Sequence, residues 1–66
     1  MSNLAEELPK EQLRARELLE TYRSIGGSGV FGAAMIEQAL ERSNKAAASG
    51  DVVAMMQSYE ELKALE

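Results

Sequence analysis

The sequence contains no cysteine, no histidine and no tryptophan. Without cysteine the chain cannot form a disulfide, and without cysteine or histidine it lacks the ligands of the usual structural zinc sites. Histidine is the usual general base near neutral pH, and cysteine is a frequent nucleophile. We therefore expect a protein that is not an enzyme and that uses no metal and no cofactor.

Long apolar runs are also missing, since none approaches the roughly 18 residues that a membrane-spanning helix needs. The first twelve residues, MSNLAEELPKEQ, are acidic and polar, unlike a secretory signal peptide. These two absences predict a cytoplasmic protein without a membrane partner.

Basic residues are few, with seven lysines and arginines against eleven acidic residues and a net charge of −4. This balance argues against a partner that is duplex nucleic acid, because such binding depends largely on neutralising phosphates. It leaves room for one local basic site that binds a small anion. A single domain of 66 residues buries only about 60% of its unfolded surface. We therefore expect a homo-oligomer, because a second copy adds buried surface.

No segment alternates with a period of two, and apolar residues recur at helical spacing instead. The chain is predicted to be all-α, a single domain over residues 1–66 with a helical hairpin, in an oligomeric bundle. The three helices are expected at about 4 or 9 to 25, 29–48 and 52–65. Asn3 and Glu6 suggest a capping box at the earlier start, whereas Pro9 suits the first turn of a helix. We favour the start at Pro9.

The second helix is predicted to be the centre of the fold. Ser28 is the expected N-cap, Gly50 the left-handed C-terminal cap, and Asp51 the N-cap of the third helix. Its apolar face is built mostly from small side chains, which let another helix approach closely. The face serves either as ordinary helix packing or as a groove for self-association or a ligand. It comprises Gly32, Ala33, Met35, Ile36, Ala39, Leu40, Ser43, Ala46 and Ala47.

Apolar stripes also run along the first and third helices. Leu13 lies opposite the stripe of the first helix, as a single exposed leucine or as part of a second contact surface. The methionines of the third helix belong either to the core or to an adaptable partner surface. The stripe of the first helix comprises Leu4, Leu8, Ala15, Leu18, Leu19, Tyr22 and Ile25, and that of the third comprises Val52, Met55, Met56, Tyr59 and Leu62.

The segment between the first two helices has three glycines in four residues, Gly26-Gly27-Ser28-Gly29. It is either a flexible turn or an anion pocket, because free amides at a helix N-terminus attract anions. A second subunit would complete such a pocket. Its predicted residues are Arg23, Gly27, Ser28, Gly29, Phe31 and Arg42.

The predicted contact surface for a second copy or another partner uses the small face of the second helix and the methionine-bearing face of the third. Its residues are Gly32, Ile36, Ala39, Ser43, Ala47, Met55, Met56 and Tyr59.

Three resemblances add expectations. The turn at 48–51, followed by Met55, Tyr59 and Leu62, resembles a tetratricopeptide-type helical hairpin, which implies a hairpin. The segments at 22–37 and 48–55 resemble short helical proteins of phages and prophages, which would place the chain in a host cytoplasm. The run MIEQAL at 35–40, followed by Asn44, is similar to the hairpin of phage cyclic-nucleotide sponges. This last resemblance implies no particular binding residues.

The expected function is therefore stoichiometric binding of a host protein or a small molecule by a small homo-oligomeric inhibitor. Two other functions stay open. One is a counter-defence sponge that sequesters a cyclic nucleotide at a subunit interface, and the other is a virion or assembly adaptor.

Overall fold

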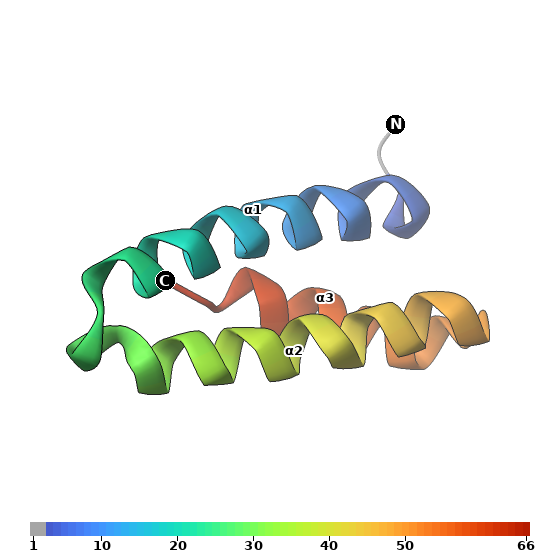
Figure 1. Cartoon of the computed structure of the whole chain (residues 1–66). Helices are drawn as coiled ribbons and strands as arrows, with labels where there is room; N and C mark the ends of the chain where they lie inside the picture. Colours follow the sequence, from blue (N-terminus) through green and yellow to red (C-terminus); the bar gives the residue numbers. More distant parts are fainter. Residues whose placement is uncertain (1–2) are drawn as a thin grey trace.

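The computed structural model describes residues 3–66, which form three α-helices and one short 3₁₀ turn. The helices are α1 (Leu4–Ile25), α2 (Val30–Ser49) and α3 (Val52–Lys63), and the turn η1 spans Gly27–Gly29. The expected all-α class is confirmed, since these described residues contain no strand. Figure 1 shows α1 and α2 as a hairpin, with α3 folded back against it.

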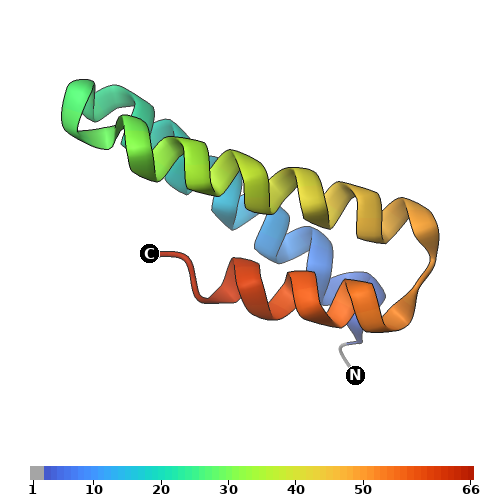
Figure 2. The ribbon, with the colours of Figure 1, turned by 90° about the horizontal axis from the view of Figure 1, so that it is seen from below.

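The three helices differ greatly in length, with 22 residues in α1, 20 in α2 and 12 in α3. At 1.5 Å per residue, α3 is about 12–15 Å shorter than its neighbours. Each helix contacts the other two. In Figure 2 the connection between α1 and α2 extends well beyond the C-terminal end of α3. One end of the hairpin is therefore not covered by the third helix.

The first helix begins at Leu4, so the favoured start at Pro9 is wrong and the earlier start is right. Asn3 is the N-cap, and its Oδ1 accepts a hydrogen bond of 3.1 Å from the amide of Glu6. Pro9 is the sixth helical residue and lies on an exposed face. It removes only the amide that would bond to the Ala5 carbonyl. The extra turn allows Leu8, which is 1% exposed, to reach the core.

The predicted N-cap of α2 is wrong, whereas its predicted C-cap is confirmed. Ser28 is not its N-cap, because Ser28 lies within η1 and Gly29 occupies the cap without a side-chain bond. Gly50 is the left-handed C-cap as predicted, with φ at 71°. The prediction for Asp51 is also confirmed, since its Oδ1 accepts from the amides of Val53 at 3.0 Å and Ala54 at 3.2 Å.

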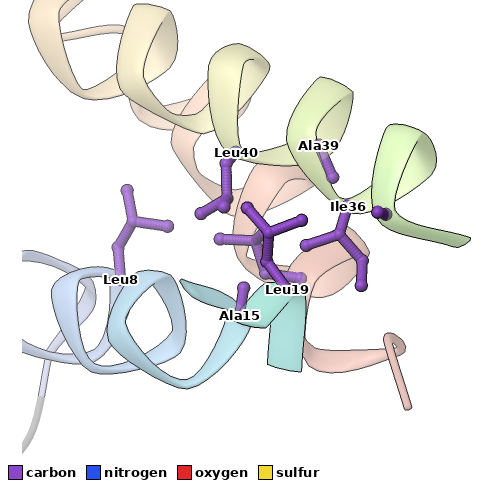
Figure 3. Packing of buried hydrophobic residues seen from close by; sticks show 8 residues of the cluster. Leu8, Ala15, Leu19, Ile36, Ala39 and Leu40 are labelled. Atoms are coloured by element: carbon purple, nitrogen blue, oxygen red, sulfur yellow. The ribbon is translucent and has the colours of Figure 1, made fainter. Parts of the chain in front are cut away.

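The core lies mainly between α1 and α2, with one leucine from α3. Leu19 from α1 and Ile36 and Leu40 from α2 point into the space between the two helices (Figure 3). Alanines at the remaining facing positions let the backbones approach. The buried cluster comprises Leu8, Ala15, Leu19, Ala33, Ile36, Ala39, Leu40 and Leu62.

One polar group bridges α1 and α2 inside this core. Gln12 is 8% exposed, and its Nε2 donates to Ser43 Oγ at 2.9 Å and to Asn44 Oδ1 at 3.0 Å. The hydroxyl of Ser43, which is fully buried, donates in turn to the Leu40 carbonyl at 2.7 Å. Buried polar groups need such partners. The inward position of Gln12 was not predicted, because only apolar residues were assigned to the stripe of α1.

Several residues predicted to face inward are exposed instead. Ile25 and Met35 lie where α3 does not reach, and Ala47 is exposed near the C-terminal end of α2. Val52 and Met56 are exposed because the inward face of α3 is centred about 60° away from the predicted stripe. Its inward line runs through Met55, Ser58 and Leu62, where the small buried Ser58 allows a close approach.

The C-terminal end of α3 is held to α1 by side-chain bonds to backbone oxygens. Arg14 donates from Nη2 to the Leu62 carbonyl at 2.7 Å and from Nη1 to the Leu65 carbonyl at 3.1 Å. The Tyr22 hydroxyl donates to the Glu66 carbonyl at 2.6 Å. A cation is favourable at a helix C-terminus, where carbonyls lack helical partners. These bonds fix the level along α1 at which α3 ends.

Gly29 provides a test of the close contact at the hairpin turn. A Cβ at Gly29 would overlap the carbonyl oxygen of Tyr22, whereas a Cβ at Gly27 would meet nothing within 4 Å. We expect Gly29→Ala to lower the free energy of unfolding by about 1–3 kcal/mol, as other overpacked sites do. Gly27→Ala is the matched control and should leave stability unchanged or slightly raised. Urea unfolding followed by circular dichroism measures both, and equal stabilities would contradict the proposed contact.

Leu62 tests whether α3 belongs to the same cooperative unit. Its side chain is fully buried, so we expect Leu62→Ala to cost about 2–5 kcal/mol. Leu13 is 56% exposed, and Leu13→Ala should change stability by no more than about 0.5 kcal/mol. Thermal melting of the two variants gives the comparison. A small effect of Leu62→Ala would mean that α3 does not pack stably on the hairpin.

Candidate binding surfaces

Arg23, the main cation of the predicted anion pocket, lies beside a cavity of about 300 Å³ at the α1–α2 connection. Its Nη2 bonds to Glu37 Oε1 at 2.8 Å, and its Nη1 bonds to Glu20 Oε1 at 3.2 Å. The hydrogen bond to Glu37 is the main reason that the pKa of Arg23 is raised. Two carboxylates therefore already oppose this charge. Glu37 also lines the cavity, and its part in it was not predicted.

The amides of the glycine turn are partly used within the turn. Gly29 is buried and donates its amide to the Gly26 carbonyl at 2.7 Å, and the Val30 amide donates to the Gly27 carbonyl. A Cβ at Gly32 would come within 2.6 Å of the Tyr22 ring, so that ring covers Gly32. The turn thus packs α1 against α2. Its Gly29 and Val30 amides are bonded internally and are not free to bind an anion.

Arg42 lies about three helical turns beyond the start of α2 and points to a different partner. It makes a bidentate pair with Glu61 of α3, from Nη2 to Oε2 at 2.6 Å and from Nε to Oε1 at 3.1 Å. This hydrogen bonding raises the pKa of Arg42. Arg42 lines a separate cavity of about 510 Å³ between α2 and α3, with Lys45 and Gln57.

The six predicted anion-site residues therefore do not form one pocket within a single chain. Arg23 and Arg42 line different cavities, and Phe31, which is 76% exposed, lines neither. A pocket that two subunits build together stays a prediction.

Most of the predicted contact surface is used inside the chain. Ile36, Ala39 and Ser43 are buried against the rest of the fold, and the Tyr22 ring covers Gly32. The prediction that these four residues contact a second copy or another partner is therefore corrected, because α1 of the same chain occupies the small face of α2. Of the other four, Met55 and Tyr59 are half-buried, whereas Ala47 and Met56 are exposed.

The uncovered end of the hairpin presents a different apolar surface, which we call the hairpin shelf. It consists of Leu18, Tyr22 and Ile25 from α1 and of Phe31 and Met35 from α2. Ile25 is 56% exposed and Met35 is 52% exposed, whereas Leu18 and Tyr22 are half-buried.

Helix geometry places the shelf on the side of the hairpin that α3 covers elsewhere. On α1, Leu18 and Ile25 follow Arg14 by four and eleven residues, and Arg14 contacts α3. On α2, Met35 precedes Arg42 by seven residues, and Arg42 pairs with α3. The shelf is therefore the continuation of the α3-binding side beyond the end of α3. The sequence contains a pattern that indicates this uncovered surface, since the third helix that it predicts is shorter than the second.

A second apolar surface lies at the opposite end, between the start of α1 and the outer side of α3. We call it the N-terminal groove. It encloses about 360 Å³ and is lined by Asn3, Leu4, Glu7, Val52, Met56, Tyr59 and Glu60. Two of these side chains are strongly exposed, Val52 at 60% and Met56 at 56%. Both charged residues of the lining are carboxylates.

Within residues 3–66, no group of three or more acidic side chains is placed to hold a metal ion. No helix in this part of the chain is long and apolar enough to cross a membrane.

Comparison with known proteins found no family model, no curated protein and no solved structure that matches this chain.

Proposed function

We propose that this chain is a small non-enzymatic binding protein that acts as a homo-oligomer, with the hairpin shelf as the contact between copies. The observation that supports this most is that Ile25, Phe31 and Met35 are each more than half exposed at one end of the hairpin. Clustered apolar side chains on a small protein are typical of an interaction surface. The absence of histidine and cysteine from the sequence supports a role without catalysis.

The charge distribution favours a second copy as the occupant of the shelf. The chain has a net charge of −4, so two copies repel each other over most of their surfaces. The five shelf residues themselves carry no formal charge, and Glu66 lies beside them, since its carbonyl accepts a hydrogen bond from the Tyr22 hydroxyl. Two copies that meet there across a two-fold axis bring uncharged side chains together, with Glu66 at the edge of the contact.

Burial of the apolar shelf side chains can offset the cost of forming a dimer. Leu18, Ile25, Phe31 and Met35 from each of two copies supply eight large side chains, each worth at most about 1.5–3 kcal/mol on full burial. Their upper-limit sum of about 12–24 kcal/mol compares with an association cost of about 4–15 kcal/mol. An association in the micromolar range is consistent with this difference once partial burial is included.

The target of the oligomer is proposed to be another protein. The nucleotide-sponge alternative receives less support, because Arg23 and Arg42 each pair with a carboxylate and line separate cavities. Native mass spectrometry of protein purified from cells separates the two functions. Bound mass of nucleotide size would support the sponge, whereas a bare oligomer would support a protein target.

Met35 provides the test of the oligomer contact. We expect Met35→Glu to convert the oligomer to monomer, because a charge would then be buried between copies. Leu13→Glu is the matched control, since Leu13 is 56% exposed and lies on the opposite face of α1. Sedimentation velocity over a range of concentrations measures the result, and circular dichroism checks that both variants fold.

Two outcomes would contradict the proposed contact. A wild-type protein that stays monomeric at millimolar concentration would remove the oligomer altogether. An oligomer that dissociates with Leu13→Glu but persists with Met35→Glu would move the contact to the outer face of α1.

A further inference from the structure

The N-terminal groove is distinct from the hairpin shelf in both position and charge. Leu4 lies in the first turn of α1 and Ile25 in its last, so the two surfaces are about 30 Å apart along the helix. In Figure 2 the start of α1 and the α1–α2 connection lie at opposite ends of the molecule. A dimer formed through the shelf therefore leaves this groove open.

Leu4 and Tyr59 of the groove also pack against the core, but core packing does not account for Val52 and Met56. Met55 faces the core, whereas its neighbour Met56 is 56% exposed and lines the groove. Val52, Met56 and Tyr59 are spaced by four and three residues, so they form one stripe along α3. Leu4 of α1 forms the facing wall. Methionine adapts its shape easily, which suits a surface that accepts a partner.

The charges around the groove are negative and weakly compensated. Glu7 contacts Lys10 at 3.7 Å, but this exposed pair is a weak interaction. Glu60 makes no ion pair within the described part of the chain. Lys63, which lies one turn away, sits over the Tyr59 ring with its Nζ 5.6 Å from the ring centre. Cationic groups of a partner would thus meet two carboxylates, one on each helix.

We propose that the N-terminal groove binds a basic amphipathic helix of a partner protein. Leucine-like side chains at helical spacing would insert between α1 and α3, and flanking lysines or arginines would contact Glu7 and Glu60. A helix fits better than an extended segment, because no strand edge among residues 3–66 is available to pair with a peptide backbone. This site does not depend on the oligomer, so it is testable on the monomeric Met35→Glu variant.

Two synthetic amphipathic peptides, each about four helical turns long, test the proposal. They share the same leucine positions and differ only in flanking residues, with lysine in one and glutamate in the other. Fluorescence anisotropy at low salt should show that the lysine peptide binds at least about tenfold more tightly, because like charges oppose the glutamate peptide. Amide NMR shifts should gather at Leu4, Val52 and Met56.

Two neutral substitutions separate the apolar and electrostatic contributions. Met56→Gln keeps the charge and the helix propensity, and it should weaken the lysine peptide about tenfold. Glu60→Gln should weaken it about two- to fivefold and reduce the preference over the glutamate peptide. Leu13→Gln is the control on another face and should change neither affinity. Circular dichroism melting confirms that each variant folds.

Three results would overturn the assignment. The first is equal affinity for the two peptides, and the second is no binding of the lysine peptide at millimolar concentration. The third is binding outside the groove, shown when Met56→Gln leaves the affinity unchanged or when the NMR shifts gather at the shelf residues.

Discussion

Glycine, alanine and serine occupy several of the positions where α1 and α2 face each other, so the two helix backbones approach closely. At the turn, Gly29 lies against the Tyr22 backbone and Gly32 lies under the Tyr22 ring. In the middle, Ser43 is fully buried and accepts a hydrogen bond from Gln12. The remaining features depend on this contact. Because α1 already occupies the small face of α2, that face is not free for a second copy, and any contact between copies has to use other residues.

The helices themselves could be predicted from local chemistry, since Gly50 and Asp51 have the side chains that end one helix and begin the next. The start of α1 is harder to predict, because Pro9 favours a later start whereas the burial of Leu8, one residue before it, goes with the earlier start. Burial depends on tertiary contacts, which local signals do not contain. The same reason explains why Gln12 was missed as a core residue.

The candidate surfaces were harder to predict than the helices. The orientation of α3 depends on which side chain is small enough for close approach, and that residue is Ser58 rather than an apolar one. A stripe chosen by hydrophobicity alone therefore placed Val52 and Met56 in the core. The predicted anion site failed to assemble within one chain for a different reason. Each of its two arginines pairs with a carboxylate on a neighbouring helix. The spacing of residues along the sequence does not predict such pairs between helices.

The two tyrosines give each surface its own optical reporter. The chain has no tryptophan, so light that phenylalanine does not absorb excites only Tyr22 and Tyr59. Tyr22 belongs to the shelf and bonds to the Glu66 carbonyl, whereas Tyr59 lines the groove under the Lys63 ammonium. Replacing either ring with phenylalanine leaves a single emitter at one end of the molecule. Events at each end can then be followed in the matching single-tyrosine variant without an attached dye.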